Sequence, residues 1–465
     1  MGRAAPSVAP GLAPPWWLQE APLDPPEPPL EGETSADVAI VGGGYTGLWT
    51  AIELRRRDPS LRVVLLEAAR CGEGPSGRNG GFLETYWCAL PRLLERVGAE
   101  GTLALARASE GVFAAVEELG EDVWLRRSGM LEVSASPAQD EAVDHAVEVA
   151  ARLGVPERAV PAARSELAER VRSPVFRRGV LFPDCATVQP ARLVRALRRQ
   201  ALSLGVVIHE RTPMVRVDEG LVTARGARLR APEIVVATNA WTASWPPVRR
   251  RLTPFGSFVV LTEPVPDLLE EIGWTGGEAI ADGRMFLHYF RTTGDGRVLM
   301  GSGSGPIGFR GRIDRRFTAD GPTAARAEAG LRRLLPALAG ARVEHAWGGP
   351  IDVSADHLPF FGTVAGTRIH YGAGYSGNGV GPSWLGGQIL ASLAFGRTDE
   401  WTSLPLATRR VPRLPPEPVR RLGGGLIRSA ILAVEEAEDA GRRPPPGARA
   451  VASLPRRLGL RVGTR

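Results

Sequence analysis

The sequence predicts a mixed α/β fold, α+β overall, in which a parallel-sheet domain is interrupted by an inserted domain built on a mostly antiparallel sheet. Residues 37–67 show the pattern of a strand, a glycine turn, a helix and a second strand. Successive short strands then occupy residues 206–237 and 256–303. A final strand at 370–372 and a helix at 382–395 return to the first pattern near the end of the chain.

Length and composition indicate an ordinary globular protein. The 465 residues exceed one core of usual size, so we expect two domains. Hydrophobic residues make up 43% and charged residues 23%, and no apolar run approaches the length that spans a bilayer, so membrane insertion is not expected. All 57 basic residues are arginines and are scattered among 51 acidic residues, so a nucleic-acid partner is not expected either.

The amino-terminal segment, residues 1–35, is rich in proline and carries Trp16 and Trp17 as an apolar anchor. It lacks the continuous apolar stretch of a signal peptide, which predicts a cytoplasmic protein. The cysteines show no CxxC spacing, so we expect neither a disulfide framework nor a metal site. They are Cys71, Cys88 and Cys185.

The elements between these landmarks give the expected domain boundaries. Helices are expected at 89–119, 136–153, 190–204, 323–338 and 427–440, and a strand at 123–133. We expect the first domain to be assembled from residues 36–90, 180–245 and 345–400, and the inserted domain from residues 91–179 and 246–344. Residues 401–465 are expected to form a tail that contains a helix.

The glycine turn has the spacing GxGxxG, formed by Gly42, Gly44 and Gly47 between a strand and a helix. Gly42 permits the tight turn, Gly44 lets a pyrophosphate approach the backbone, and Gly47 lets helix and strand pack closely. Tyr45 and Thr46 begin the helix, whose N-terminus offers free N–H groups and a partial positive charge to phosphates. The pattern predicts a dinucleotide site, against the alternative of a structural turn.

An acidic residue ends the second strand. Glu67 lies twenty residues after Gly47, where a carboxylate accepts hydrogen bonds from an adenosine ribose and repels a ribose phosphate. We therefore expect Glu67 and the following Ala68 to contact the nucleotide.

Two further glycine clusters favour FAD over NAD. The first follows the acid at once and consists of Ser76, Gly77, Arg78, Asn79, Gly80 and Gly81. Such small residues let the backbone lie along a ribityl chain and ring, although a flexible loop has the same composition. The second cluster, residues 372–382, precedes the last helix, whose N-terminus would stabilise an anionic reduced flavin by about 0.3 to 2 kcal/mol.

Four motifs resemble the FAD-dependent amine and amino-acid oxidoreductases, a family that includes D-amino-acid oxidase, glycine oxidase and sarcosine oxidase. They are DVAIVGGGYTGLWTAIEL at 37–54, SGRNGG at 76–81, IVVATNAW at 234–241 and YGAGYSGNGV at 371–380. The resemblance covers about Trp16 to Trp401 and points to the γ-glutamylputrescine oxidoreductase branch. It implies a Rossmann-like FAD-binding domain of the glutathione-reductase type with an inserted substrate domain.

The resemblance also implies which residues contact the cofactor. Val215 would place its backbone against the adenine, and Ala237 and Thr238 would lie beside the nucleotide. Contacts with the isoalloxazine are implied for Gly377, Asn378, Gly379 and Val380, and Gly374 is expected to bind the cofactor with them. Some relatives attach FAD to a cysteine in the last third of the chain, but none lies beyond Cys185, so non-covalent FAD is expected.

The strand expected at 284–291 is the candidate roof of the substrate site. Alternation places Tyr289 and Arg291 on one face and His288 on the other. Tyr289 is a candidate to orient an amine, Arg291 a candidate to pair with a carboxylate, and His288 the alternative polar contact. Tyr375 is a further candidate because its loop is expected beside the ring. A structural role is open for each.

The resemblance implies that a small-molecule amine or amino acid loses a hydride from the carbon beside its nitrogen to flavin N5, giving an imine that hydrolyses. This chemistry needs no carboxylate pair, so Asp352 and Asp356 are expected to fix loops. Some relatives use a lysine near N5 to react with oxygen. This chain has no lysine, so oxygen or another acceptor takes the electrons by other means. A flavin-dependent aromatic hydroxylase and a non-catalytic FAD-binding protein are the alternatives.

Overall fold

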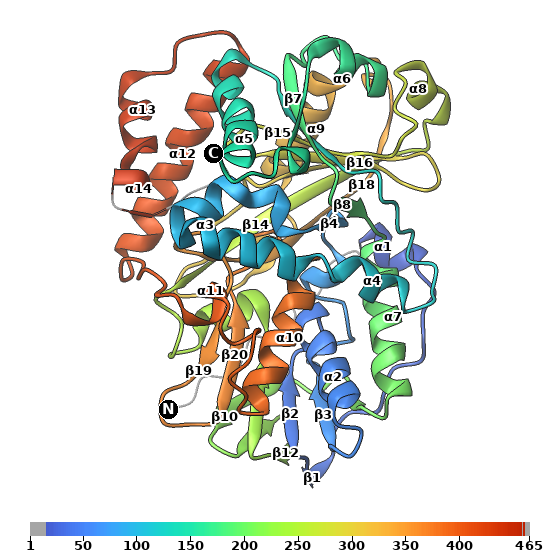
Figure 1. Ribbon diagram of the computed structural model, residues 1–465, viewed down its shortest axis with the longest axis vertical. Coiled ribbons are helices and arrows are strands. Elements are labelled where there is room, and N and C mark those ends of the chain that lie inside the picture. Colours follow the sequence, from blue (N-terminus) through green and yellow to red (C-terminus); the bar gives the residue numbers. More distant parts are fainter. Residues whose placement is uncertain (1–14, 458, 461–465) are drawn as a thin grey trace.

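Two large sheets organise the chain (Figure 1). The computed structural model describes residues 15–457 and 459–460. A six-stranded sheet, in the order β19-β20-β13-β2-β3-β9, lies in the lower half of the view. An eight-stranded sheet, in the order β18-β14-β17-β16-β15-β5-β7-β6, lies in the upper half.

The six-stranded sheet is parallel except at one edge. Its parallel strands are β2 (Val38–Val41), β3 (Val63–Leu66), β9 (Val207–His209), β13 (Glu233–Val236) and β20 (Ile369–Ala373). β19 (Phe360–Thr363) pairs with β20 in the antiparallel sense. β2, β3 and β13 are continuous apolar runs or nearly so, because helices and loops cover both faces of the sheet.

Three helices and a small sheet complete this half. The helices are α2 (Tyr45–Arg57), α7 (Pro190–Ser203) and α10 (Pro382–Ala394). α10 lies close against α2, since a Cβ on Gly387 would come within 2.6 Å of the Cβ of Trp49. The small sheet has the order β1-β12-β11-β10 and is formed by β1 (Gly32–Ser35), β12 (Ala227–Arg230), β11 (Leu221–Ala224) and β10 (Met214–Asp218).

The eight-stranded sheet is antiparallel except where β15 pairs with β5. Its strands are β5 (Met130–Ser134), β6 (Val160–Ala162), β7 (Arg178–Phe182), β14 (Leu252–Thr262), β15 (Ala279–Asp282), β16 (His288–Thr292), β17 (Val298–Ser302) and β18 (Val343–Ser354). One face packs apolar side chains against α9 (Gly321–Leu334). A two-stranded ribbon, β4 (Phe82–Glu84) with β8 (Cys185–Thr187), lies between the two halves.

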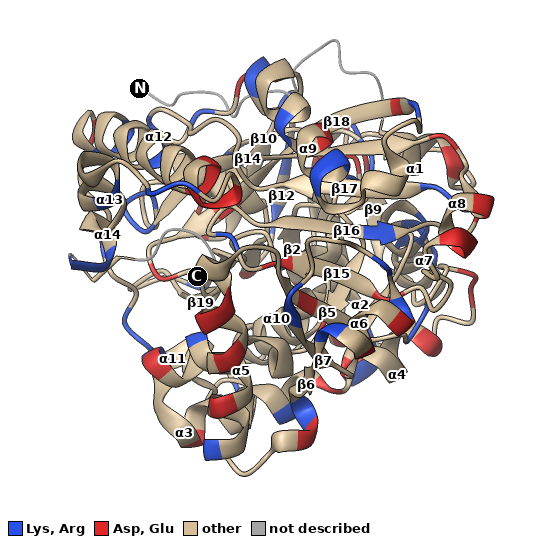
Figure 2. Cartoon of the chain, turned by 90° about the horizontal axis from the view of Figure 1, so that it is seen from above, with Lys and Arg blue, Asp and Glu red and all other residues tan. Residues whose placement is uncertain are grey.

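The other helices cover the flanks. They are α1 (Trp16–Glu20), α3 (Leu90–Ser109), α4 (Val112–Glu117), α5 (Asp140–Arg152), α6 (Arg164–Arg170), α8 (Pro266–Glu271), α11 (Pro405–Thr408), α12 (Val419–Asp439), α13 (Pro446–Ala452) and α14 (Leu454–Arg457). Within the described residues, every helix is too short or too polar to cross a bilayer. Figure 2 shows acidic and basic positions interspersed around the molecule.

The expected fold class is confirmed, whereas three local predictions are wrong. The helix expected at 89–119 is interrupted at Gly98, which adopts φ 71°, and α4 follows as a separate helix. The strand expected at 123–133 is confined to β5, and Trp124 takes a left-handed conformation with φ 56°. The strand expected at 284–291 starts only at His288, because Asp282 accepts the N–H groups of Arg284 and His288 and closes a turn. The division into domain segments stays a prediction.

Candidate active site

The glycine turn between β2 and α2 leaves no room for side chains. Gly42 has φ +113°, and a Cβ on it would lie 2.4 Å from the carbonyl oxygen of Ala237. A Cβ on Gly47 would lie 1.9 Å from the carbonyl oxygen of Gly42. Gly44 supplies no side-chain cap to α2, and the N–H of Tyr45 donates to the hydroxyl of Ser76 at 3.0 Å, so the N–H groups that follow and the helix dipole are available to an anion.

Glu67 stands directly after β3 beside this turn. Its carboxylate accepts hydrogen bonds from the N–H of Gly43 at 2.7 Å and from the N–H of Ala69 at 2.9 Å. Burial raises the pKa of Glu67 above its ordinary value. The arrangement fixes an acid at the lip of the turn, where an adenosine ribose is expected.

A cavity of about 1700 Å³ runs along the turn, the acid and both later glycine clusters. Its volume exceeds the ~300–1,000 Å³ of ordinary small-molecule pockets and suits an extended dinucleotide. The predicted residues that line it are Gly42, Gly44, Tyr45, Thr46, Glu67, Ala68, Ser76, Asn79, Val215, Ala237, Thr238, Tyr375, Gly377, Gly379 and Val380. The structure places the other predicted cofactor residues outside this lining: Gly47, Gly77, Arg78, Gly80, Gly81, Gly374 and Asn378.

The loop 76–81 is held by hydrogen bonds from both halves of the molecule. The indole of Trp17 donates to the carbonyl of Asn79 at 3.0 Å, and the indole of Trp347 donates to the carbonyl of Arg78 at 2.9 Å. Gly80 packs against the ring of Tyr289, where a Cβ would lie 2.8 Å from a ring carbon. The small residues of this loop therefore serve close packing in a fixed conformation.

The loop 372–381 is fixed by a buried acid. Asp352 accepts the N–H of Gly374 and, at 3.2 Å, the side-chain amide of Asn239. Burial raises the pKa of Asp352 to about 7. The hydroxyl of Tyr375 shares a 2.8 Å hydrogen bond with that of Thr46, which ties this loop to the start of α2.

The expected loop-fixing roles of Asp352 and Asp356 are confirmed. Asp356 pairs with Arg409 and accepts the hydroxyl of Ser354 at 3.3 Å, so it holds the turn before β19. Tyr375 lines the cavity, but its hydroxyl points to Thr46. Its contacts are those of a side chain that positions the loop.

The roof strand β16 presents its polar residues on two faces. Tyr289 is half-buried, bonds Ser257 through its hydroxyl at 2.8 Å and meets the ring of Phe82 edge to face at 5.7 Å. His288 lies on the opposite face, where its ring pairs with Asp282 at 2.8 Å and packs against Gly330 of α9. Of these two candidates, the structure brings only Tyr289 to the glycine loops.

Arg291 shares the face of Tyr289 but is fully engaged. Its guanidinium donates to the carbonyls of Gly81 at 3.1 Å and Val188 at 2.6 Å. Burial lowers the pKa of Arg291 to about 9. The arrangement anchors the loop 76–81 to the inserted sheet.

Two acids beside these loops are not predicted by the sequence. Glu84 ends the three-residue strand β4, and the amide of Asn378 donates to it at 2.6 Å. Glu132 lies in the middle of β5, on the same face as Tyr289. Neither belongs to a motif, and both reach the site through strand pairing between distant segments.

The comparison with protein families decides the identification. The family model described as "FAD dependent oxidoreductase" matches residues 37–393. The chain belongs to this family. The predicted family resemblance and the FAD cofactor are thereby confirmed, whereas non-covalent attachment stays a prediction.

Individual relatives span most of the chain. The probable oxidoreductase OrdL of Rhizobium meliloti (strain 1021) is 29% identical over 91% of this chain and 96% of its own length. The gamma-glutamylputrescine oxidoreductase of Escherichia coli (strain K12) is 28% identical over 81% and 88%. Among solved structures, glycine oxidase from Geobacillus kaustophilus superposes with a TM-score of 0.68 at 21% identity, covering 81% of this chain and all of its own. That likeness supports the fold.

Proposed function

We propose that this enzyme uses FAD to oxidise an amine or amino acid at the carbon beside its nitrogen, by hydride transfer to flavin N5. The imine formed then hydrolyses to a carbonyl compound. One observation carries the proposal: Tyr289 of the eight-stranded sheet packs against Gly80 in the loop 76–81, whose Ser76 and Asn79 line the dinucleotide cavity together with Gly377, Gly379 and Val380. Two relatives, a glycine oxidase and a gamma-glutamylputrescine oxidoreductase, carry names that agree with such a substrate.

The residues present fit FAD. The uncapped start of α2 would receive the pyrophosphate, Glu67 the ribose hydroxyls, and the loops 76–81 and 377–380 the flavin. α10 also begins without a side-chain cap after this last loop, and its dipole would favour negative charge at the flavin. When bound, FAD supplies the acceptor of the hydride.

The protein's own part is to position and shield the substrate. Tyr289 offers a hydroxyl to the amine while Ser257 holds its ring in place. Phe82 and Tyr289 close the space beside loop 76–81 with their rings, which limits the access of water. Arg291 keeps that loop in register with the sheet through its two carbonyl contacts.

The first test is spectroscopic. The purified protein should carry the absorption spectrum of bound FAD, and that spectrum should bleach when amines or amino acids are added without oxygen. Re-oxidation by air would then identify an oxidase, and its absence a dehydrogenase with another acceptor. Bound flavin that is reduced by NADPH and by no amine or amino acid would contradict the proposal in favour of a hydroxylase. Flavin that no compound reduces would indicate a binding role.

A further inference from the structure

One row of residues crosses the eight-stranded sheet above the loops. Pairing aligns Glu132 with Ala281, Ala281 with Tyr289, and Tyr289 with Gly301. Side chains of directly paired residues point to the same face of a sheet. Glu132 therefore faces the same space as Tyr289, two strands away, with only the methyl group of Ala281 between them.

Glu132 has no partner within the described part of the chain. Its carboxylate makes no hydrogen bond and no ion pair there, although the side chain is half-buried. Burial is the main cause that raises the pKa of Glu132 to about 7, and the charges of Asp282 and Glu84 add to it. A half-buried carboxylate without a partner costs free energy, so its place at this site calls for a ligand.

Glu84 faces the same space from the other side. It lies two residues after Phe82 on β4, and Phe82 meets the ring of Tyr289. Asn378 donates to one oxygen of Glu84, which ties the acid to the last glycine loop. Burial raises the pKa of Glu84 to about 7, whereas the charge of nearby Arg92 and the hydrogen bond from Asn378 lower it.

The cations that the sheet places on this face are already engaged. Arg291 donates to two backbone carbonyls, and Arg178 pairs with Asp144 at 2.7 Å. No guanidinium of the described strands is left on this face to receive a substrate carboxylate. Glu132 is left to receive a cation, and so is Glu84, which accepts from Asn378 and lies near Arg92 of α3 without an ion pair to it among the described residues.

We propose that Glu132 and Glu84 receive the substrate as an alkylammonium ion, so that the enzyme selects amines that carry no carboxylate on the carbon to be oxidised. This inference rests on the proposed function. It assigns to Glu132 and Glu84 the selection between amines and amino acids, the two substrate classes that the family resemblance leaves open.

The carboxylates of Glu132 and Glu84 can also accept the proton that must leave the substrate ammonium ion before oxidation. The ammonium ion transfers one proton to a carboxylate, which leaves a neutral amine and a carboxylic acid. Bound FAD would accept the hydrogen of the C–H bond with both of its electrons, and the nitrogen lone pair would form the C=N bond of an iminium ion. Water adds to this ion and releases a carbonyl compound and ammonium. An acid that titrates near neutrality is suited to the first step.

The experiment uses ligands that cannot react. tert-Butylammonium and 2-aminoisobutyrate have no hydrogen on the carbon beside nitrogen, and only the second carries a carboxylate there. Each is titrated into the holoenzyme, and the change in the flavin absorption spectrum gives its Kd. We expect tert-butylammonium to bind at least about tenfold more tightly than 2-aminoisobutyrate. Glu132→Gln and Glu84→Gln should each raise the Kd of tert-butylammonium by about tenfold or more.

Glu141→Gln is the matched control, because Glu141 is an exposed acid in the first turn of α5. It should change that Kd by less than about twofold. Tighter binding of 2-aminoisobutyrate, or an unchanged Kd in both glutamine variants, overturns the inference. If amino acids alone reduce the flavin, the proposed function stands and this inference fails. If neither amines nor amino acids reduce it, both fail.

Discussion

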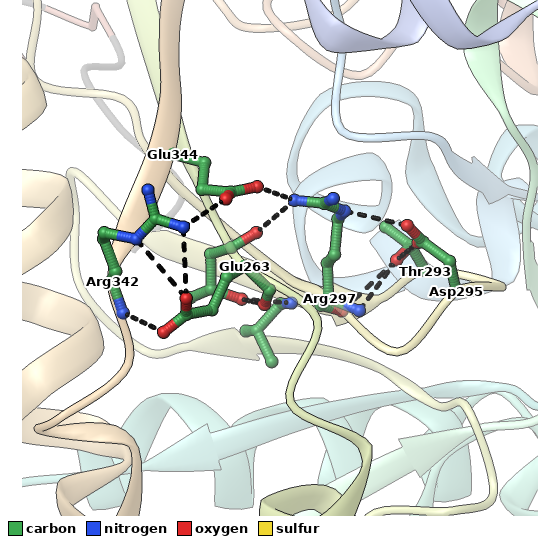
Figure 3. A network of polar contacts seen from close by, with 8 residues as sticks. Glu263, Thr293, Asp295, Arg297, Arg342 and Glu344 are labelled. Carbon is green, nitrogen blue, oxygen red and sulfur yellow. Dashed lines mark hydrogen bonds and ion pairs between the residues drawn. The ribbon is translucent and has the colours of Figure 1, made fainter.

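Among the described residues, acidic side chains of the eight-stranded sheet are paired with arginines at its edge but not above the glycine loops. At the ends of β14, β17 and β18, acids and arginines form one network (Figure 3). Its charged members are Glu263, Asp295, Arg297, Arg342 and Glu344. Arg297 joins Asp295 at 2.8 Å and Glu344, and Arg342 joins Glu344 at 2.6 Å. Every carboxylate in this network has a guanidinium partner.

Above the loops, among the residues that the structure describes, Glu132 has no such partner and the Glu84 carboxylate accepts only from the amide of Asn378. The chain can clearly neutralise acids on this sheet, since it does so at the edge with abundant arginine. Acids without an ion-pair partner beside the glycine loops therefore indicate a position where the substrate brings the positive charge.

The largest expected effect is on turnover. Glu132→Gln removes the proton acceptor and the negative charge, so we expect kcat/KM for a primary amine to fall by about 100-fold. Steady-state assays at about pH 8 with equal flavin content measure this. A value within about twofold of the unaltered enzyme would place Glu132 outside the reaction.

Breaking the paired network should affect stability and leave turnover unchanged. Arg297→Ala removes the arginine partner of Asp295, leaves Glu344 with Arg342 alone, and removes a hydrogen bond to the carbonyl of Thr262. We expect the free energy of unfolding to fall by about 1 to 3 kcal/mol in urea titrations. Arg342→Ala, at a more exposed position, should cost less than about 1 kcal/mol. Loss of amine turnover in the Arg297 variant would contradict the view that the edge network serves stability alone.

Glu132→Gln should stabilise the fold in a pH-dependent way. The folded protein holds the proton of Glu132 up to a pKa of about 7, whereas an unfolded chain releases it near the ordinary 4.5. Stability is therefore lost as pH rises between these values, and a neutral glutamine avoids the loss. We expect a gain of about 1 to 2 kcal/mol at about pH 8 that vanishes near pH 4.5. Thermal unfolding at both pH values checks this, and an equal change at both would contradict it.

The smallest effect is expected from Tyr289→Phe. The hydroxyl of Tyr289 already bonds Ser257, so its removal costs one hydrogen bond while the ring keeps its contact with Phe82. We expect kcat/KM to fall by about 2- to 10-fold. A fall as large as that of Glu132→Gln would make Tyr289, rather than the acids, the main contact of the amine.

The dinucleotide turn could be predicted from sequence because its requirements are local. Gly42 needs a glycine for its φ of +113°, and Gly47 for its close contact with the carbonyl of Gly42, and both requirements arise within one strand, turn and helix. The loops 76–81 and 372–382 could be predicted from their glycine-rich composition. Glu84 and Glu132 could not be predicted, because a three-residue strand and the pairing of β5 with β15 bring them to the site.

Long-range contacts also decide the other differences from the sequence analysis. Arg291 was considered a carboxylate partner, yet Gly81 and Val188 meet it from another part of the chain. His288 is held away from the loops by Asp282, six residues before it, and by α9. Gly98 interrupts the predicted long helix by its left-handed conformation, which the apolar pattern around it does not reveal.

The most direct test compares 1-aminobutane with norvaline, which carries a carboxylate on the same carbon. Each is mixed with the holoenzyme in the absence of oxygen, and the visible absorption of the flavin is followed with time. The account predicts that 1-aminobutane bleaches the flavin at least about tenfold faster than norvaline at equal concentration. Faster bleaching by norvaline would contradict the role assigned to Glu132 and Glu84.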